Sequence, residues 1–237
     1  MGAGIHEAKI SELERDGRLL ARSSTTEQVA LILRERITDG LFPPGTRLSE
    51  ESIGAALRVS RNTLREAFRL LAHERLVEHR LNRGVFVRQL SPEDVVALFR
   101  MRRIVECAAL RELAAAPEKA IHAVRKAVEN AEAAAEAGRW NEVGTASMQF
   151  HEAIVGLAGS PHLKEFMHHV LAELRLAVGV ASYQRRLHEP QLARKRVLLD
   201  LIEARDAQTA EQTMAEYLSD AREELLRVCT EAAEAVD

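Results

Sequence analysis

The stretch that decides the fold is Ser60–Arg61–Asn62–Thr63–Leu64–Arg65–Glu66, in the N-terminal third of this 237-residue chain. Ser60 is a favourable N-cap, because its side chain can accept a hydrogen bond from a backbone N–H of the first helical turn. Apolar residues follow at Leu64, Ala67 and Leu71, which is the spacing of one helix face. The stretch therefore predicts a helix that begins after Ser60 and packs this face inward.

A second helix is expected immediately before the first. Ser49 can cap it, and Ile53, Ala56 and Leu57 give it an apolar face. Between the two helices, Leu57–Arg58–Val59 leaves room only for a tight turn. Two helices joined by so short a turn form a helix-turn-helix.

A β-hairpin is expected after the helix-turn-helix. Leu76–Val77–Glu78–His79 and Val85–Phe86–Val87–Arg88 are β-prone runs on either side of Arg80–Leu81–Asn82–Arg83–Gly84, where Gly84 can supply a positive φ. Helical spacing of apolar residues also begins near Thr25 and stops at Asp39–Gly40. Residues 25–90 are thus predicted to form a winged helix-turn-helix of three helices plus a short β-hairpin.

The rest of the chain is predicted to be entirely helical. Ser91–Pro92–Glu93–Asp94 combines a capping serine, a proline suited to the first helical position and acidic residues that favour a helix N-terminus, so a domain boundary falls near residue 90. Helices are expected over about 92–115, 117–137, 140–157, 160–187, 190–205 and 207–233. The fold class is therefore mainly α, with an antiparallel bundle of about six helices over 91–237 and a flexible arm over 1–24.

Composition supports a globular, helical protein and excludes several other classes. Hydrophobic residues make up 46% of the chain and aromatic residues 4%. The two cysteines, Cys107 and Cys229, match neither a disulfide framework nor a zinc-ligand spacing. No apolar run approaches the roughly 18 residues of a membrane span, and Met1 to Ile10 lacks the apolar core of a signal peptide. We therefore expect a cytoplasmic protein with no membrane association.

Charge is unevenly distributed along the sequence. The net charge is −3, yet residues 55–90 contain 8 Lys and Arg against 3 Asp and Glu. A basic surface on a mildly acidic body suits a DNA-reading head joined to a regulatory domain. On charge alone, an ordinary solvated surface explains the excess equally well.

The head carries a set of short motifs that resembles the GntR family of winged-helix regulators. These motifs are Gly40–Leu41, Pro44–Gly45, Arg47–Leu48–Ser49–Glu50, Val59–Ser60–Arg61, Leu64–Arg65–Glu66–Ala67 and Arg83–Gly84–Val85–Phe86–Val87. Because the second domain is all-helical, the chain is similar to the fatty-acid-regulator branch, whose C-terminal domain binds effectors and dimerises. The chain departs from the family pattern at Arg58 and Arg75, where glycine is usual, and at Asn62–Thr63, which replaces a common Thr-Pro.

The recognition helix places its first residues against the base edges of the major groove of double-stranded DNA. Arg61 and Arg65 can take guanine bidentately and Asn62 can take adenine, whereas the salt bridge typical of Glu66 in such heads keeps that residue away from DNA. Ser60 lies at the same reading end, phosphates suit Arg58, Thr63 and Arg69, and the wing tip can reach the minor groove. The predicted DNA-binding residues are Arg58, Ser60, Arg61, Asn62, Thr63, Arg65, Arg69, Arg80, Asn82, Arg83 and Gly84.

Many members of this branch hold a divalent metal in the helical domain with one Asp and three His. At the corresponding positions this chain has Ser147, His151, Lys195 and Tyr217. A single imidazole holds such an ion poorly and an ammonium repels it, so we expect neither a metal nor another cofactor. These four residues and Arg102 are predicted to face one cavity that binds an organic carboxylate or an acyl-thioester.

The cavity residues have structural alternatives. Arg102 and Glu106 are four residues apart on one predicted helix and can pair with each other. His151 can be a hydrogen-bonded histidine of the core, and Lys195 can point to solvent.

Three functions follow from these observations. The first is a repressor that binds a near-palindromic operator as a homodimer and is released by its effector. The second is a metal-independent DNA-binding regulator without an effector. The third is an enzyme that uses His151, Lys195 and Tyr217, although no nucleophile elbow, phosphate loop or HExxH motif is present.

Overall fold

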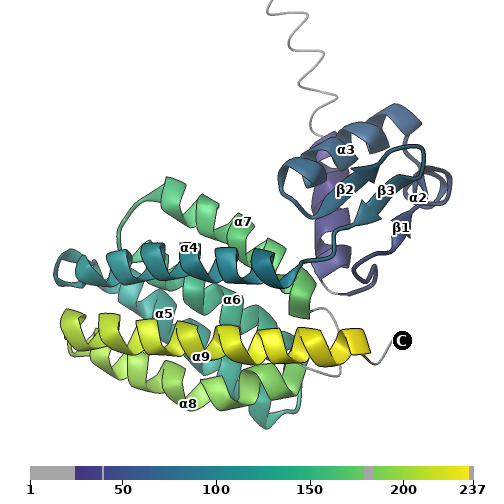
Figure 1. Ribbon diagram of the computed structural model, residues 1–237. Helices are drawn as coiled ribbons and strands as arrows, with labels where there is room; N and C mark the ends of the chain where they lie inside the picture. Colours follow the sequence, from purple (N-terminus) through teal and green to yellow (C-terminus); the bar gives the residue numbers. More distant parts are fainter. Residues whose placement is uncertain (1–24, 39, 179–183, 235–237) are drawn as a thin grey trace, which may run out of the picture. The chain divides into compact units, whose positions relative to one another are not determined.

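A computed structural model describes residues 25–38, 40–178 and 184–234 (Figure 1). The chain folds into two compact units that divide between Arg88 and Gln89. The predicted arm over 1–24 lies outside the described residues. Among the described helices, none combines the length and the apolar composition that a membrane crossing requires.

The N-terminal unit is a winged helix-turn-helix, as predicted. Its elements are a first helix over 25–38, β1 (Arg47–Leu48), α2 (Glu50–Leu57), α3 (Arg61–His73), β2 (Val77–Arg80) and β3 (Gly84–Val87). The strands form an antiparallel sheet in the order β1-β3-β2. Strand β1, which pairs Leu48 with Val85, was not expected from the sequence.

The helix signals near the fold-deciding stretch are confirmed. Ser60 caps α3 by accepting a hydrogen bond from the backbone N–H of Thr63, and Ser49 caps α2 through the N–H of Ser52. Arg58 and Arg75 have φ of 54° and 58°, so the two turns at which the family usually has glycine do require a left-handed backbone. Leu64, Ala67, Phe68 and Leu71 of α3 are fully buried, which fixes the orientation of this helix in the head.

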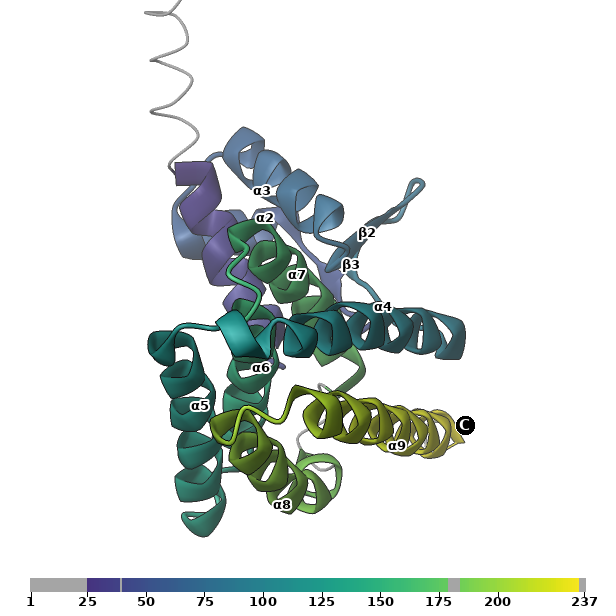
Figure 2. The same ribbon diagram turned by 90° about the vertical axis from the view of Figure 1, so that its left-hand side faces the viewer.

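The C-terminal unit is an all-helical bundle, as predicted (Figure 2). Its helices are α4 (Pro92–Arg111), η1 (Leu113–Ala115), α5 (Glu118–Glu136), α6 (Trp140–Gly156), α7 (Pro161–Val178), α8 (Gln184–Glu203) and α9 (Ala207–Glu234). Ser91 and Asp94 form a capping box at the start of α4. Helices α4 and α9 pack along one another in opposite directions and carry much of the core (Figure 1).

One pair of predicted helix boundaries was wrong. The helix expected over 160–187 ends at Val178, and α8 already begins at Gln184, so Pro190 lies inside α8 and does not start a helix. Proline removes one helical hydrogen bond, which made Pro190 a reasonable boundary. The segment stays helical because Gln184, Leu187 and Gln191 are buried at helical spacing on one face, and this packing outweighs the lost hydrogen bond.

Candidate functional site

The first turn of α3 presents the predicted base-reading residues to solvent. Ser60, Arg61 and Asn62 are exposed, while Thr63 is half-buried and its hydroxyl lies 2.8 Å from the Ser60 hydroxyl. Arg61 has no ion pair within the described part of the chain. Its guanidinium is therefore available for a phosphate or a base edge.

The other arginines of the recognition helix are paired with carboxylates. Arg65 donates from Nε to both carboxylate oxygens of Glu50 on α2, at 3.1 and 3.0 Å. Arg69 donates to Glu66 at 2.6 Å, which confirms the salt bridge expected for Glu66. Pairs this exposed are worth only about 0–1 kcal/mol, so DNA phosphates or bases can replace the carboxylates.

The wing tip projects a basic, exposed loop. Arg80 lies over the ring of Phe86, with its guanidinium carbon 4.5 Å from the ring centroid, and it also pairs with Glu78. Asn82 and Gly84 have φ of 57° and 102°, which closes the turn between the strands. Arg83 is exposed beside them. Arg58, in the turn before α3, is exposed as well.

In the C-terminal unit, all five residues predicted to face one cavity are buried. Arg102 comes from α4, Ser147 and His151 from α6, Lys195 from α8 and Tyr217 from α9. Ser147 and His151 share one helix face because they are four residues apart. The bundle thus brings together side chains from four helices.

Two hydrogen-bonded groups connect these side chains. Arg102 Nε donates to Glu106 Oε1 at 2.9 Å, Glu106 Oε2 lies 2.7 Å from His151 Nδ1, and His151 Nε2 lies 3.3 Å from the Tyr217 hydroxyl. Lys195 Nζ donates to Ser147 Oγ at 2.7 Å. The pairing of Arg102 with Glu106 that the sequence left open is therefore present, and His151 is a hydrogen-bonded core histidine that also faces a cavity.

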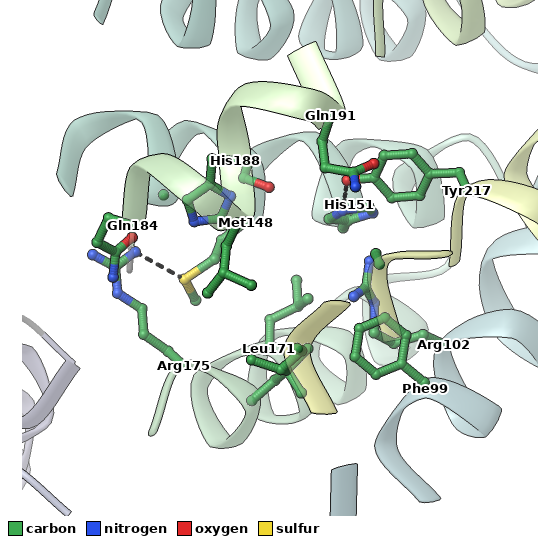
Figure 3. A pocket seen from close by; sticks show the side chains of 16 residues that line it. Phe99, Arg102, Met148, His151, Leu171, Arg175, Gln184, His188, Gln191 and Tyr217 are labelled. Carbon is green, nitrogen blue, oxygen red and sulfur yellow. Dashed lines mark hydrogen bonds between the residues drawn. The ribbon is translucent and has the colours of Figure 1, made fainter. Parts of the chain in front are cut away.

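This cavity has a volume of about 90 Å³ and is shown in Figure 3. Four of the five predicted residues line it, namely Arg102, Ser147, His151 and Tyr217. Lys195 does not, because it is fully buried behind the wall and reaches the cavity only through its hydrogen bond to Ser147.

The sequence did not identify the remaining polar wall of the cavity. Gln184, His188 and Gln191 of α8 line it together with Arg175 of α7. The α8 residues share one helix face with Lys195, and this spacing could have identified them. The helix boundary wrongly expected at Pro190 placed them on two different helices.

Burial controls the charges around the cavity. It lowers the pKa of His151 to about 4, with a further lowering from the charge of Arg102, so the imidazole is neutral at pH 7. Burial alone would raise the pKa of Glu106, but its contacts with His151 and Arg102 lower it below the ordinary value. Burial also lowers the pKa of Lys195 to about 7. The cavity lining contains two guanidinium groups, those of Arg102 and Arg175, and Arg102 is paired with the Glu106 carboxylate.

The residues present do not fit a divalent metal. At the position that the family resemblance gives to a metal ligand, this chain has the Lys195 amine, whose hydrogen bond occupies the Ser147 hydroxyl. Over the described residues there is no group of three or more His, Cys, Asp and Glu side chains that could hold such an ion. An organic anion matches the charge and the donors of the site.

One donor of the cavity has no partner. Arg102 Nη2 is buried and forms no hydrogen bond with any residue in the described ranges. Buried polar groups in native proteins are almost always hydrogen-bonded to protein or water, so this guanidinium nitrogen is available to donate to a ligand or a water molecule in the cavity.

Comparisons with known proteins match both units of the chain. The bacterial regulatory proteins of the gntR family match residues 25–87, and the FCD domain family matches residues 97–220. A GntR transcription regulator of known crystal structure from Rhodococcus sp. RHA1 has 42% sequence identity and a TM-score of 0.80, over 86% of this chain and 98% of that chain.

Two relatives that are named as transcriptional repressors are similar over most of their length. The protein named probable D-xylose utilization operon transcriptional repressor, from Paenarthrobacter nicotinovorans, is 29% identical over 87% of this chain and 91% of its own. The transcriptional repressor RspR of Escherichia coli K12 is 27% identical over 85% of this chain and 89% of its own. The chain is thus a DNA-binding transcription regulator and not an enzyme, and it belongs to the GntR family, in the branch that carries a C-terminal FCD domain.

Proposed function

We propose that the protein is a ligand-controlled repressor that binds a near-palindromic operator as a homodimer. Its domains are the head over 25–90 and the effector-binding and dimerisation domain over 91–237. Two heads on adjacent half-sites, about 34–36 Å apart, would each insert α3 into a major groove. The names of the two similar repressors favour repression over activation.

In the head, Arg61 and Arg65 read bases together with Asn62. Ser60 lies at the same reading end, Arg58, Thr63 and Arg69 hold the phosphates, and Arg80, Asn82, Arg83 and Gly84 of the wing reach the minor groove. The support is the exposure of the first turn of α3 and of the wing tip, and the excess of positive charge along residues 55–90.

In the bundle, a small organic anion binds in the cavity and releases the operator. The observation that carries this step is Arg102 Nη2, buried at the cavity wall without an acceptor. A carboxylate is the natural partner of a guanidinium because both are planar and forked.

The DNA part is tested by selecting operator sequences from a random duplex library with the full-length protein and measuring binding by gel shift at physiological salt. We expect Arg61→Ala with Arg65→Ala to abolish the preference for the selected sequence while weaker, salt-sensitive binding to any DNA remains. Sequence-specific binding by the double variant at the wild-type level would refute the assignment of these two residues.

The effector part is tested by thermal-shift screening against carboxylates and acyl-CoA esters, followed by gel shift with each stabilising compound. Binding to the native state alone raises the melting temperature. A carboxylate that both stabilises the protein and releases the operator supports the proposal. If no carboxylate stabilises the protein, it acts as a regulator without this effector.

A further inference from the structure

The amide of Gln191 is another unpartnered polar group at the cavity. Gln191 is buried, with an exposed fraction of 7%. Its Oε1 is buried and accepts no hydrogen bond from any residue that the structure describes. Gln191 lines the same cavity as Arg102, and Figure 3 shows both side chains projecting toward it from different helices, with His151 near them.

Arg102 Nη2 and the Gln191 amide differ in what they can bind. Arg102 Nη2 is a donor only and bears positive charge, so it matches a carboxylate. The Gln191 amide offers an acceptor oxygen and a donor NH₂ side by side. A hydroxyl complements both atoms because it can donate to one and accept from the other, and this holds for either orientation of the amide.

The cavity is small, with a volume of about 90 Å³. Acids of three or four carbons with one hydroxyl are among the smallest molecules that carry both a carboxylate and a hydroxyl. They are therefore the first ligands to compare in this cavity.

We propose that the cavity takes a short hydroxycarboxylate, whose carboxylate accepts from Arg102 Nη2 and whose hydroxyl meets the amide of Gln191. This inference rests on the proposed function, since it specifies the class of the effector. The neutral imidazole of His151 and the hydroxyl of Tyr217 complete a polar surface between the two anchoring groups. Ligands of the same length without the hydroxyl would leave the Gln191 amide unpaired.

The experiment compares matched pairs of acids with the full-length protein by thermal shift and titration calorimetry. The pairs are lactate with propionate and 3-hydroxybutyrate with butyrate, and alanine tests an ammonium in place of the hydroxyl. We expect at least one hydroxy acid to bind at least about tenfold more tightly than its unsubstituted partner, because the partner leaves a buried amide unsatisfied.

Gln191→Leu should remove this preference, so that the two acids of a pair bind within about twofold of each other. Gln149→Leu is the matched control, because Gln149 is exposed on α6 and should leave the preference unchanged. The comparison of acids on the wild-type protein does not depend on whether Gln191→Leu folds.

The possible failures are distinguishable. If both acids of each pair bind equally to the wild type, the hydroxyl assignment is refuted and the carboxylate effector stands. If alanine binds as tightly as lactate, a donor alone is sufficient and the hydroxyl assignment is refuted as well. If none of the acids binds and the wider carboxylate screen is also negative, the proposed effector class itself fails.

Discussion

Nδ1 of His151 lies 2.7 Å from Oε2 of Glu106, and both side chains are almost completely buried in the helical bundle. Glu106 is ionised and can only accept, so the proton of the neutral imidazole is on Nδ1 and the lone pair is on Nε2. Tyr217 can then donate to Nε2 across 3.3 Å. This carboxylate thereby fixes the tautomer of a histidine that lines the cavity.

Acid should destabilise the bundle through His151. Its pKa is about 4 in the native protein and about 6.5 in the unfolded chain, so between these values the unfolded chain binds more protons and stability falls as the pH falls. Denaturant unfolding at several pH values should show this loss. His151→Gln should weaken it, whereas His162→Gln, at an exposed site on α7, should leave it unchanged. An unchanged pH dependence in His151→Gln would contradict the burial argument.

Lys195→Met should change how the free energy of unfolding depends on pH above pH 7. The pKa of Lys195 is lowered to about 7 by burial, so from pH 7 to about 10 the unfolded chain holds a proton that the native protein has lost. The free energy of unfolding contributed by this group therefore rises with pH over that range. We expect the rise to be smaller in Lys195→Met and the variant to be at least as stable as the wild type at pH 7, because methionine fills the site without a buried charge.

The matched control for Lys195→Met is Lys164→Met, which replaces an exposed lysine of α7. Its unfolding free energy should follow the wild-type pH dependence. Equal pH dependence in wild type and Lys195→Met would show that Lys195 keeps its proton in the native protein.

Features that depend on neighbouring residues could be predicted from the sequence, and features that depend on long-range packing could not. Ser49, Ser60 and Ser91 act on their own first turns, so their helix starts could be read directly. Strand β1 could not, because Leu48 belongs to a strand only through its long-range pairing with Val85. Side chains of the cavity wall on α8, such as Gln191, were missed because tertiary burial keeps the segment around Pro190 helical against its local preference.

Gly144→Ala should reduce effector binding with little effect on stability. A Cβ at this position would lie 2.8 Å from Gln184 Oε1 and 3.2 Å from His188 Nε2, so both side chains would have to shift within the cavity wall. These are side-chain ends that can move, and alanine favours the helix by up to about 1 kcal/mol over glycine. We expect a melting temperature close to that of the wild type and a clear loss of ligand affinity by calorimetry.

Gly156→Ala is the control on the same helix, because its Cβ would meet nothing within 4 Å. It should bind the effector like the wild type. Full affinity in Gly144→Ala would place the ligand away from α6.

Glycine should be more stable than alanine at position 75 of the head. Arg75 has φ of 58° in the turn after α3, a conformation that costs an ordinary residue about 1–2 kcal/mol and glycine little. Arg75→Ala removes the same side chain but keeps the strained backbone, so the difference between the two variants isolates the backbone term. We expect the glycine variant to be about 1 kcal/mol more stable than the alanine variant in denaturant unfolding, and equal stabilities would contradict the strain.

Glu50→Gln should strengthen operator binding by releasing Arg65. Glu50 holds the Arg65 guanidinium at 3.0 and 3.1 Å, and a base or a phosphate must displace it before Arg65 can contact DNA. An exposed pair of this kind is worth about 0–1 kcal/mol, which corresponds to at most about a fivefold gain in affinity. Removing a negative charge also strengthens DNA binding in general, so Glu51→Gln serves as the control, because it has the same charge change on the same helix.

Gel shifts should show a larger gain in operator affinity for Glu50→Gln than for Glu51→Gln, and the excess should disappear when Arg65 is replaced by alanine. Equal gains for the two variants would mean that Arg65 does not have to leave Glu50 to bind the operator.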